Sequence, residues 1–227
     1  MQTCNNGLSQ LSILKCIASI RVAAIVALSL SGLLAGTVAG RSENAVETIL
    51  FIRHGEKPQG GLGQLTCQGL NRALALAPAM AKSFGRPDAI FAPNPSHPKM
   101  DDGQPYDYVR PLATVEPTAI WFGLPVDVSL DIYDTAGLLA AIEKRRAPDR
   151  NVLILVAWEH RQIAPIVRAL LTAHGADPEI VRTVEDWKRE DFDSIYVVRI
   201  STVGNLAKVT FDHEYEGLDG QPDACPR

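Results

Sequence analysis

The order of apolar and polar positions along the chain predicts strands that alternate with helices. Two continuous apolar runs, Thr48–Ile52 and Asn151–Ala157, are typical of strands buried on both faces. After the first run, apolar residues recur at helical spacing behind Thr66, which can cap a helix. Further strands are expected at 88–92, 126–128, 194–200 and 206–211, and helices at 66–80, 112–122, 135–146 and 161–174. The alternation predicts an α/β three-layer sandwich with a mainly parallel central sheet.

Two stretches depart from this regular pattern. Residues 93–108 are polar and contain four prolines, so they are expected to form a long loop, and loops of that length are usually functional or disordered. Pro117 is expected to interrupt or kink the helix over 112–122. Gly204 and Asn205 suggest a hairpin between the last two strands.

The first forty residues form a separate segment. They carry Lys15 and Arg21 but no acidic residue, and they continue into an apolar run from Val22 to Ala35 that is followed by small residues. This order is typical of a secretory signal peptide. An uncleaved anchor is the alternative, because residues 22–40 are just long enough to span a bilayer. The chain is therefore expected to be exported, to the periplasm or the cell exterior, with a signal peptide or membrane anchor over 1–40 and one catalytic domain over 41–227.

Composition narrows the range of partners. The chain has 227 residues, of which 46% are hydrophobic and 21% charged, an ordinary globular mixture. The net charge of −4 and the lack of a basic run disfavour nucleic-acid binding.

Two of the four cysteines, Cys67 and Cys225, lie beyond residue 40. In an oxidising compartment these two thiols either pair or stay free, and the sequence leaves both open.

Chemically active side chains follow both apolar strands. Arg53-His54-Gly55-Glu56 follows the first, and Glu159-His160-Arg161 follows the second. In open α/β sheets, ligands bind beyond the carboxyl ends of the strands. An arginine matches phosphate oxygens, and a neutral imidazole is a competent nucleophile toward phosphorus. Gly55 is expected where the backbone approaches a ligand closely. These residues predict a phosphate pocket with a built-in nucleophile.

A metal site is the alternative for two histidines at neighbouring strand ends. Glu56 or Glu159 could supply a third ligand. The chain has no HExxH, HxH or HxxxH spacing, so no metal and no other cofactor is expected.

The residues after the first strand also resemble a known family. Arg53-His54-Gly55 behind an apolar strand is similar to the RHG signature of the histidine phosphatase superfamily, which has the phosphoglycerate mutase-like fold. The helix start Leu65–Ala73, with Thr66 and Gly69, resembles the segment that follows this signature in the family. The resemblance extends over about residues 48–200.

The other motifs of the family also have counterparts. Arg110, with Thr114 four residues later, resembles the second arginine, and His160 resembles the second histidine. The resemblance implies that His54 attacks phosphorus and becomes a phosphohistidine, and that water then releases phosphate. It implies that Arg53, Arg110 and His160 hold the phosphoryl oxygens, without any metal or organic cofactor.

The sequence departs from the family at two places. The family often has a serine pair before its second arginine, where this chain has the 93–108 stretch, in which Tyr106 and Tyr108 are candidates to line the site. The leaving group also needs a proton. By its place after the next strand, Asp134 fits the family's acid, with Asp131 and then Glu159 as alternatives. If none of them serves, substrates with good leaving groups, such as phosphohistidine or acyl phosphates, would be favoured.

The sequence thus predicts an exported phosphatase that hydrolyses phosphomonoesters, either small phosphorylated molecules or a phosphoprotein. A non-catalytic module that binds phosphoryl groups or anions with the same fold is one alternative. A phosphomutase is the other, and the predicted signal peptide disfavours it because the substrates of central metabolism are cytoplasmic.

Overall fold

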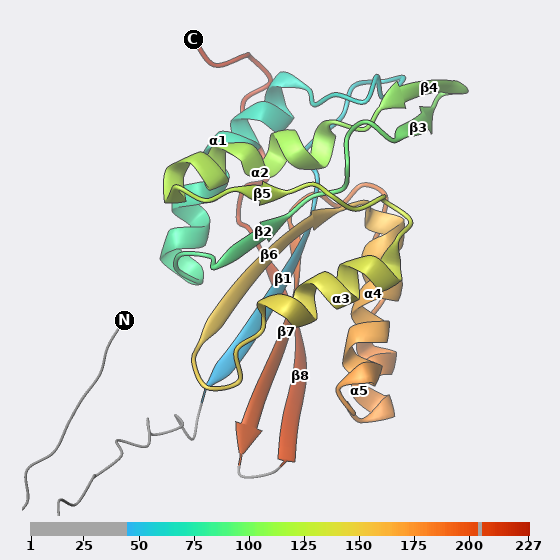
Figure 1. Cartoon of the computed structure of the whole chain (residues 1–227). Helices are drawn as coiled ribbons and strands as arrows, with labels where there is room; N and C mark the ends of the chain where they lie inside the picture. Colours follow the sequence, from blue (N-terminus) through green and yellow to red (C-terminus); the bar gives the residue numbers. More distant parts are fainter. Residues whose placement is uncertain (1–44, 204–205) are drawn as a thin grey trace, which may run out of the picture. The chain divides into compact units, whose positions relative to one another are not determined.

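The computed structural model describes residues 45–203 and 206–227, and the side chains of 202–207 are left out of the description (Figure 1). The predicted signal peptide or anchor at 1–40, with its tether at 22–40, lies outside the described residues. Within the described ranges, every helix is too short or too polar to cross a bilayer.

A six-stranded sheet forms the centre of the described chain. Its spatial order is β5-β2-β6-β1-β7-β8. The strands are β1 (Val46–Arg53), β2 (Ala89–Phe91), β5 (Val126–Asp127), β6 (Val152–Trp158), β7 (Ser194–Val203) and β8 (Leu206–Tyr215). Strands β5, β2, β6 and β1 pair with one another in parallel, whereas β7 pairs antiparallel with β1 and β8 antiparallel with β7. The predicted α/β class with a mainly parallel sheet is confirmed.

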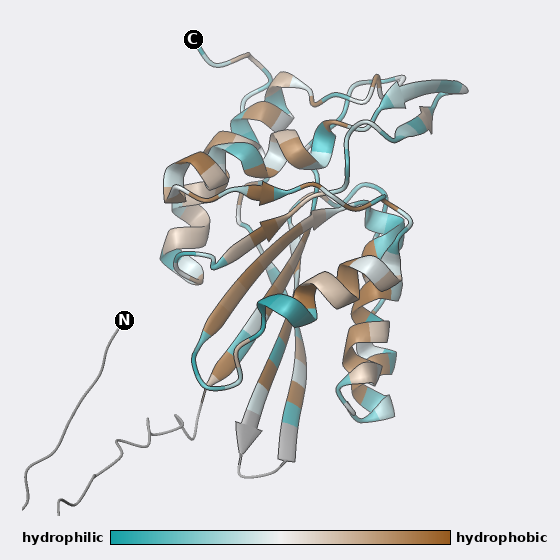
Figure 2. Cartoon of the chain, in the orientation of Figure 1, coloured by the Kyte–Doolittle hydropathy of each residue, from teal (hydrophilic) through white to brown (hydrophobic). Residues whose placement is uncertain are grey.

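Helices cover both faces of this sheet (Figure 1). The helices are α1 (Cys67–Ser83), α2 (Arg110–Phe122), α3 (Thr135–Arg145), α4 (His160–Ala173) and α5 (Pro178–Thr183). On β1, Leu50 and Ile52 pack in a cluster with apolar residues of α1 and α2, whereas Ile49 and Phe51 pack with residues of α3 and α4. Side chains alternate across a strand, so an all-apolar strand needs apolar cover on both sides, which explains the three layers. Figure 2 shows the same pattern as apolar colouring along the central strands.

The stretch expected to be a loop over 93–108 contains a hairpin instead. Strand β3 (Pro98–Asp101) pairs antiparallel with β4 (Gln104–Asp107) in a separate two-stranded sheet. The turn residues Asp102 and Gly103 both have positive φ, 48° and 78°, as the tight turns of two-residue hairpins require. The hairpin projects beside the carboxyl end of the main sheet (Figure 1).

Smaller differences concern helix ends and one added helix. Helix α2 begins at Arg110, two residues earlier than expected, and its assignment continues unbroken through Pro117. Helix α5 is absent from the sequence-based expectation. It begins at Pro178 behind the cap Asp177, whose side chain accepts a hydrogen bond from the Glu179 N–H at 2.8 Å. Strands β7 and β8 pair antiparallel as expected, and the turn residues 204 and 205 lie outside the described ranges.

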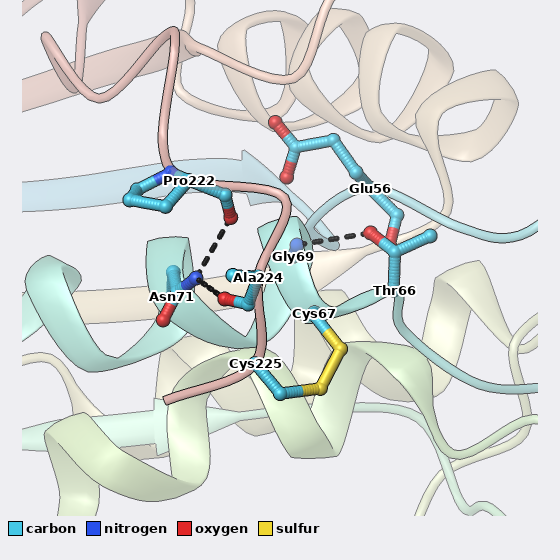
Figure 3. The surroundings of a disulfide bond; sticks show 8 residues. All are labelled: Glu56, Thr66, Cys67, Gly69, Asn71, Pro222, Ala224 and Cys225. Carbon is cyan, nitrogen blue, oxygen red and sulfur yellow. Dashed lines mark hydrogen bonds between the residues drawn. A yellow bond between two sulfur atoms is a disulfide. The ribbon is translucent and has the colours of Figure 1, made fainter. Parts of the chain in front are cut away.

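A disulfide joins the C-terminal tail to the start of α1 (Figure 3). Cys67 and Cys225 are 158 positions apart in sequence, and their Cα atoms are 4.5 Å apart. One turn further along α1, the Asn71 amide donates hydrogen bonds to the carbonyls of Pro222 and Ala224, each at 2.8 Å. Of the two states that the sequence left open for these cysteines, the structure has the paired one.

Candidate active site

The pairing of β1 with β6 places the two histidine-bearing segments at one edge of the sheet. In this parallel pair, Arg53 is opposite Trp158. His54 therefore leaves β1 where Glu159 and His160 leave β6. Because both strands end at the same level, their next residues share the carboxyl edge, where open sheets bind ligands.

Arg53 is held by a loop that follows α5. Its Nη1 donates to the carbonyls of Arg189 (2.5 Å) and Asp191 (2.8 Å), and its guanidinium lies 3.9 Å from the ring centroid of Phe192. The Nε atom is buried and has no hydrogen-bond partner among the described residues. Burial lowers the pKa of Arg53 to about 10, against the opposing charge of Glu159, so the group stays cationic at neutral pH.

His54 presents a neutral imidazole. Its Nδ1 lies 2.7 Å from the Gly55 carbonyl, and because a carbonyl only accepts hydrogen bonds, Nδ1 carries the hydrogen. Burial and the charges of Arg53 and Arg110 hold the pKa of His54 well below its ordinary value. The Nε2 atom consequently keeps its lone pair at neutral pH, as a nucleophile requires.

Gly55 is needed for helix packing. A Cβ at this position would lie 2.9 Å from the Gly69 carbonyl, in the first turn of α1. This contact between the His54 loop and α1 is one reason for a glycine here, and the expectation that Gly55 also lets the backbone approach a ligand stays a prediction. The helix start is fixed by Thr66, whose hydroxyl accepts a hydrogen bond from the Gly69 N–H at 3.1 Å (Figure 3).

Arg110, the first residue of α2, is buried and held by the β3–β4 hairpin and by Gly61 of the loop that follows β1. Its Nη1 and Nη2 donate to the Asp101 carboxylate at 2.5 and 3.3 Å, and Nη1 also donates to the Gly61 carbonyl at 3.1 Å. The Nε atom is buried without a partner in the described part of the chain. Burial would raise the pKa of Asp101, but the hydrogen bond and charge of Arg110 lower it below its usual value.

Gly61 has a left-handed backbone that the Asp101 carboxylate packs against. Its φ is 76°, and a Cβ at this position would overlap the Asp101 side chain. A residue with a side chain would therefore be strained there and would displace Asp101 from Arg110.

His160 begins α4 beside a buried carboxylate. Glu159 caps this helix by accepting from the Arg161 N–H at 2.8 Å, and it also accepts from Lys99 Nζ at 2.8 Å. Burial favours the neutral form of Glu159, but Lys99 outweighs it and the pKa of Glu159 is lowered. Burial and Arg53 lower the pKa of His160 to about 4, and its buried Nδ1, 3.2 Å from Glu159 Oε1, makes no hydrogen bond in the described ranges.

The Tyr108 ring lies at the centre of these groups. It stands edge-on to His54, with centroids 6.0 Å apart, and it lies 4.8 Å from the Arg110 guanidinium and 4.9 Å from Lys99 Nζ. Lys99 in turn reaches His160 through Glu159. The charges of Arg53 and Lys99 lower the pKa of both His54 and His160. The four residues Arg53, His54, Arg110 and His160 thus belong to one cluster.

Unpartnered buried atoms mark this cluster as a site for an anion. Six buried side-chain polar atoms of the described residues lack a partner, and four of them belong to the cluster: Arg53 Nε, Arg110 Nε, Tyr108 Oη and His160 Nδ1. Buried polar groups are rarely left unsatisfied in native proteins, so such a concentration favours a binding site for a polar ligand. Three of the four are donors in a cationic setting, which matches an oxyanion.

A cavity of about 560 Å³ opens beside the cluster. Arg53 and Phe192 form the wall toward the cluster, and Lys57 and Arg189 add positive charge. The loop 58–60, Asp102 at the hairpin tip and Glu190 complete the lining. This cavity is large enough for the remainder of a small phosphorylated substrate.

The three candidate proton donors lie in different environments. Asp134 is exposed and caps α3, where its side chain accepts from the Gly137 N–H at 2.8 Å. Asp131 lies 2.7 Å from His97 Nδ1. Glu159 belongs to the cluster but is ion-paired with Lys99. The structure places Asp134 in a capping position and shows no contact between it and the cluster in the described ranges, so its role as proton donor stays a prediction from sequence.

Glu56 belongs to a second, structural cluster. Arg72 of α1 is fully buried and pairs with four carboxylates, those of Glu56, Asp193, Glu216 and Asp219, at 2.8–3.0 Å. Burial raises the pKa of Glu216, and the charge and hydrogen bond of Arg72 oppose this shift. The network fixes α1, the His54 loop and the C-terminal segment together.

Several residues of the site were not predicted from the sequence. Lys99 and Asp101 belong to the hairpin in the stretch expected to be a loop, and Phe192 belongs to the segment between α5 and β7. The dipeptide Asp102-Gly103 is a strong hairpin signal and could have revealed the first two. In the described ranges, no group of three or more His, Cys, Asp or Glu side chains is placed to hold a metal ion, and independence of cofactors stays a prediction.

Comparisons with known proteins give structural similarity alone. No family model and no curated protein sequence matches the chain. The structure is similar to phosphoglycerate mutase from Plasmodium falciparum, with 11% identity and a TM-score of 0.46 over 73% of this chain and 89% of that one. It is also similar to a protein from Nakamurella multipartitia assigned as the phosphohistidine phosphatase SixA. The identity is 15% and the TM-score 0.48, over 75% of this chain and 96% of that one.

A third similar structure is the mycobacterial glucosyl-3-phosphoglycerate phosphatase with inorganic phosphate, with 18% identity and a TM-score of 0.44 over 74% of this chain and 95% of that one. These solved structures come from the family that the sequence motifs resemble. With TM-scores below 0.5, the function assigned to the chain rests on the geometry of its own site.

Proposed function

We propose that the chain is a phosphatase of the histidine phosphatase superfamily that hydrolyses phosphomonoesters through a phosphohistidine on His54. One observation carries this proposal: a neutral, buried imidazole lies in a cluster with two buried arginines whose Nε donors have no partner in the described ranges. A nucleophile surrounded by fixed cations suits attack on a phosphoryl group, because such transfer needs positioning and charge neutralisation above all.

The reaction has two steps. In the first, His54 Nε2 attacks phosphorus, an N–P bond forms, and the bond from phosphorus to the leaving oxygen breaks. In the second, water attacks phosphorus, the N–P bond breaks, and inorganic phosphate leaves with His54 neutral again. Arg53 and Arg110 neutralise the phosphoryl oxygens throughout, and their fixed acceptors keep the guanidinium planes in place.

His160 adds a donor whose charge depends on the ligand. Its pKa is low in the ligand-free site because burial and nearby cations disfavour a further positive charge. A bound phosphoryl dianion reverses that balance and favours the protonated imidazole, which then donates to a phosphoryl oxygen.

Good leaving groups are expected to be preferred substrates. The carboxylates of the cluster, Asp101 and Glu159, are held ionised by Arg110 and Lys99 and have no proton to give. The leaving groups of phosphohistidine, acyl phosphates and aryl phosphates depart without much protonation. The alkoxide of an alkyl phosphate needs a proton from an acid. The adjoining cavity, with Lys57 and Arg189, suits the remainder of a small phosphorylated molecule or of a phosphoprotein side chain.

We also propose that the protein is exported to the periplasm or the cell exterior. The basic and apolar order of residues 1–40 supports export. The Cys67–Cys225 disulfide supports it as well, because disulfides persist mainly in oxidising compartments.

The test compares the full-length protein with its H54A variant on p-nitrophenyl phosphate. We expect the wild type to release phosphate and to trap an acid-labile, alkali-stable phosphoryl group, and H54A to lose both. H174A is the matched control, since His174 follows α4 and pairs with Glu143, away from the cluster, and it should keep full activity.

Three results would overturn the proposal. Full activity of H54A would exclude the nucleophile. Phosphate or vanadate binding by the wild type without turnover of any phosphoester would indicate a non-catalytic module. Isomerisation of a substrate without phosphate release would indicate a mutase.

A further inference from the structure

Tyr108 has a buried hydroxyl in the phosphate cluster that nothing in the described chain satisfies. The residue is 1% exposed, and it lies between the β3–β4 hairpin and Arg110 at the start of α2. Its Oη atom has no hydrogen-bond partner within residues 45–203 and 206–227. A phenol that served only packing could be replaced by phenylalanine without leaving a buried donor unpaired.

The surroundings of the ring restrict what this hydroxyl can bind. Arg110 lies 4.8 Å and Lys99 4.9 Å from the ring centroid, and both bring donors. The nearby carboxylate of Glu159 already accepts from Lys99 and from the Arg161 N–H. The hydroxyl therefore lacks an acceptor in a region crowded with positive charge, and an oxyanion is the ligand that supplies one.

We propose that Tyr108 Oη donates a hydrogen bond to an oxygen of the phosphoryl group bound at His54. This inference rests on the proposed function and adds a ligand for the phosphoryl group that comes from the segment just before α2. The edge-on position of the ring against His54, at 6.0 Å between centroids, places Tyr108 beside the nucleophile.

The hydroxyl acts as a fixed donor that keeps its proton. Burial raises the pKa of Tyr108 above its ordinary value, and Arg110 offsets only part of this. The phenol is neutral over the whole physiological range, so it binds the phosphoryl oxygen without transferring a proton to the leaving group.

The test uses Y108F in the full-length protein, with Y215F as the matched control. Tyr215 is an exposed tyrosine at the end of β8, outside the phosphate cluster. We expect Y108F to lower kcat/KM for p-nitrophenyl phosphate and to weaken inhibition by vanadate, each by about 10- to 100-fold, the loss typical of one hydrogen bond to a charged group. Y215F should change both by less than about threefold.

A second readout separates binding from folding. The melting temperature of ligand-free Y108F should equal or exceed that of the wild type, because an unpaired donor has been removed, while the stabilisation by added phosphate should shrink. Wild-type values of kcat/KM and vanadate inhibition in Y108F would overturn the inference. So would failure of Y108F to fold, because the hydroxyl would then have a structural partner.

The outcomes for the two proposals are distinguishable. If H54A is inactive and Y108F behaves like the wild type, the Tyr108 inference alone fails. If H54A is fully active, the proposed function fails, and vanadate binding to Y108F still reports whether the hydroxyl contacts an oxyanion.

Discussion

The Thr114 hydroxyl joins the His54 loop to the helix that carries Arg110. It accepts a hydrogen bond from the Gly55 N–H at 2.9 Å and donates one to the Arg110 carbonyl at 2.9 Å. Both bonds are buried, and they connect segments 59 residues apart in sequence. The position of the His54 imidazole relative to the Arg110 guanidinium therefore depends on the hydroxyl oxygen of Thr114.

Replacing Thr114 should affect stability and activity together. T114V keeps the shape but leaves the Gly55 N–H without an acceptor, so we expect a loss of about 1–3 kcal/mol in the free energy of unfolding. Displacement of His54 should also lower kcat/KM by at least about tenfold. Urea unfolding and an assay with p-nitrophenyl phosphate measure the two effects.

T114S is the control for this substitution. It restores the hydroxyl without the methyl group and should recover most of the activity. Wild-type stability in T114V would show that the Gly55 N–H finds another acceptor.

His160 should make the folded state sensitive to mild acid. Its pKa is about 4 in the folded protein, below the ordinary value of 6.5 that it regains on unfolding. Between these values the unfolded chain binds more protons, so the stability that comes from the neutral imidazole is complete above about pH 6.5 and is lost as the pH falls toward 4.

The variant H160Q isolates this contribution. We expect its free energy of unfolding to fall less steeply than that of the wild type between about pH 6.5 and pH 4, by up to about 1.4 kcal/mol per pH unit. Urea unfolding at several pH values in this range gives the comparison. Parallel curves for the two proteins would contradict the lowered pKa of His160.

Asp134 offers a test between a capping and a catalytic role. Asparagine can cap a helix but cannot donate a carboxylic proton, and alanine can do neither. From the cap geometry we expect D134A to lose about 1 kcal/mol of stability and D134N to keep both stability and activity. The measurements are urea unfolding and kcat/KM on an aryl and an alkyl phosphate. A selective loss of alkyl phosphate hydrolysis in D134N would instead assign Asp134 as the proton donor.

The disulfide should contribute strongly to stability. Cys67 and Cys225 close a loop over 158 positions, and removing a crosslink of this kind commonly costs about 2–5 kcal/mol. Reduction with dithiothreitol should therefore lower the urea midpoint of the wild type. The double variant C67A/C225A should show the low midpoint with and without reductant. A midpoint that reductant does not change in the wild type would contradict the bond.

The strands were predictable where burial alone determines them. Thr48–Ile52 and Asn151–Ala157 are apolar on both sides, and only the middle of a covered sheet accommodates such segments. The hairpin at 98–107 was missed because prolines disfavour strands, although Pro98 is tolerated at the first strand position and the Asp102-Gly103 turn compensates. Helix α5 is short, and six residues carry too little periodicity to detect.

The site was predictable to the extent that sequence neighbours determine it. Arg53, His54 and His160 follow buried strands, so the pairing of these strands implied their common edge. The groups that hold Arg53 could not be predicted from the sequence. They are the backbone carbonyls of residues 189 and 191, and every residue type carries a carbonyl. Lys99 and Asp101 were hidden because their partners lie on other elements.

The cavity beside Arg53 is bordered mainly by connecting segments, whereas the nucleophile and its cationic partners are anchored to β1, α2 and α4. Connecting segments tolerate change far better than the interior of a sheet. Exchanging the side chains of residues 57–60, 189 and 190 should therefore change the preferred substrate without changing the reaction. Phe192 is left out of this set because its ring packs on the Arg53 guanidinium. A library confined to those positions is expected to yield new selectivity from an unaltered reaction centre.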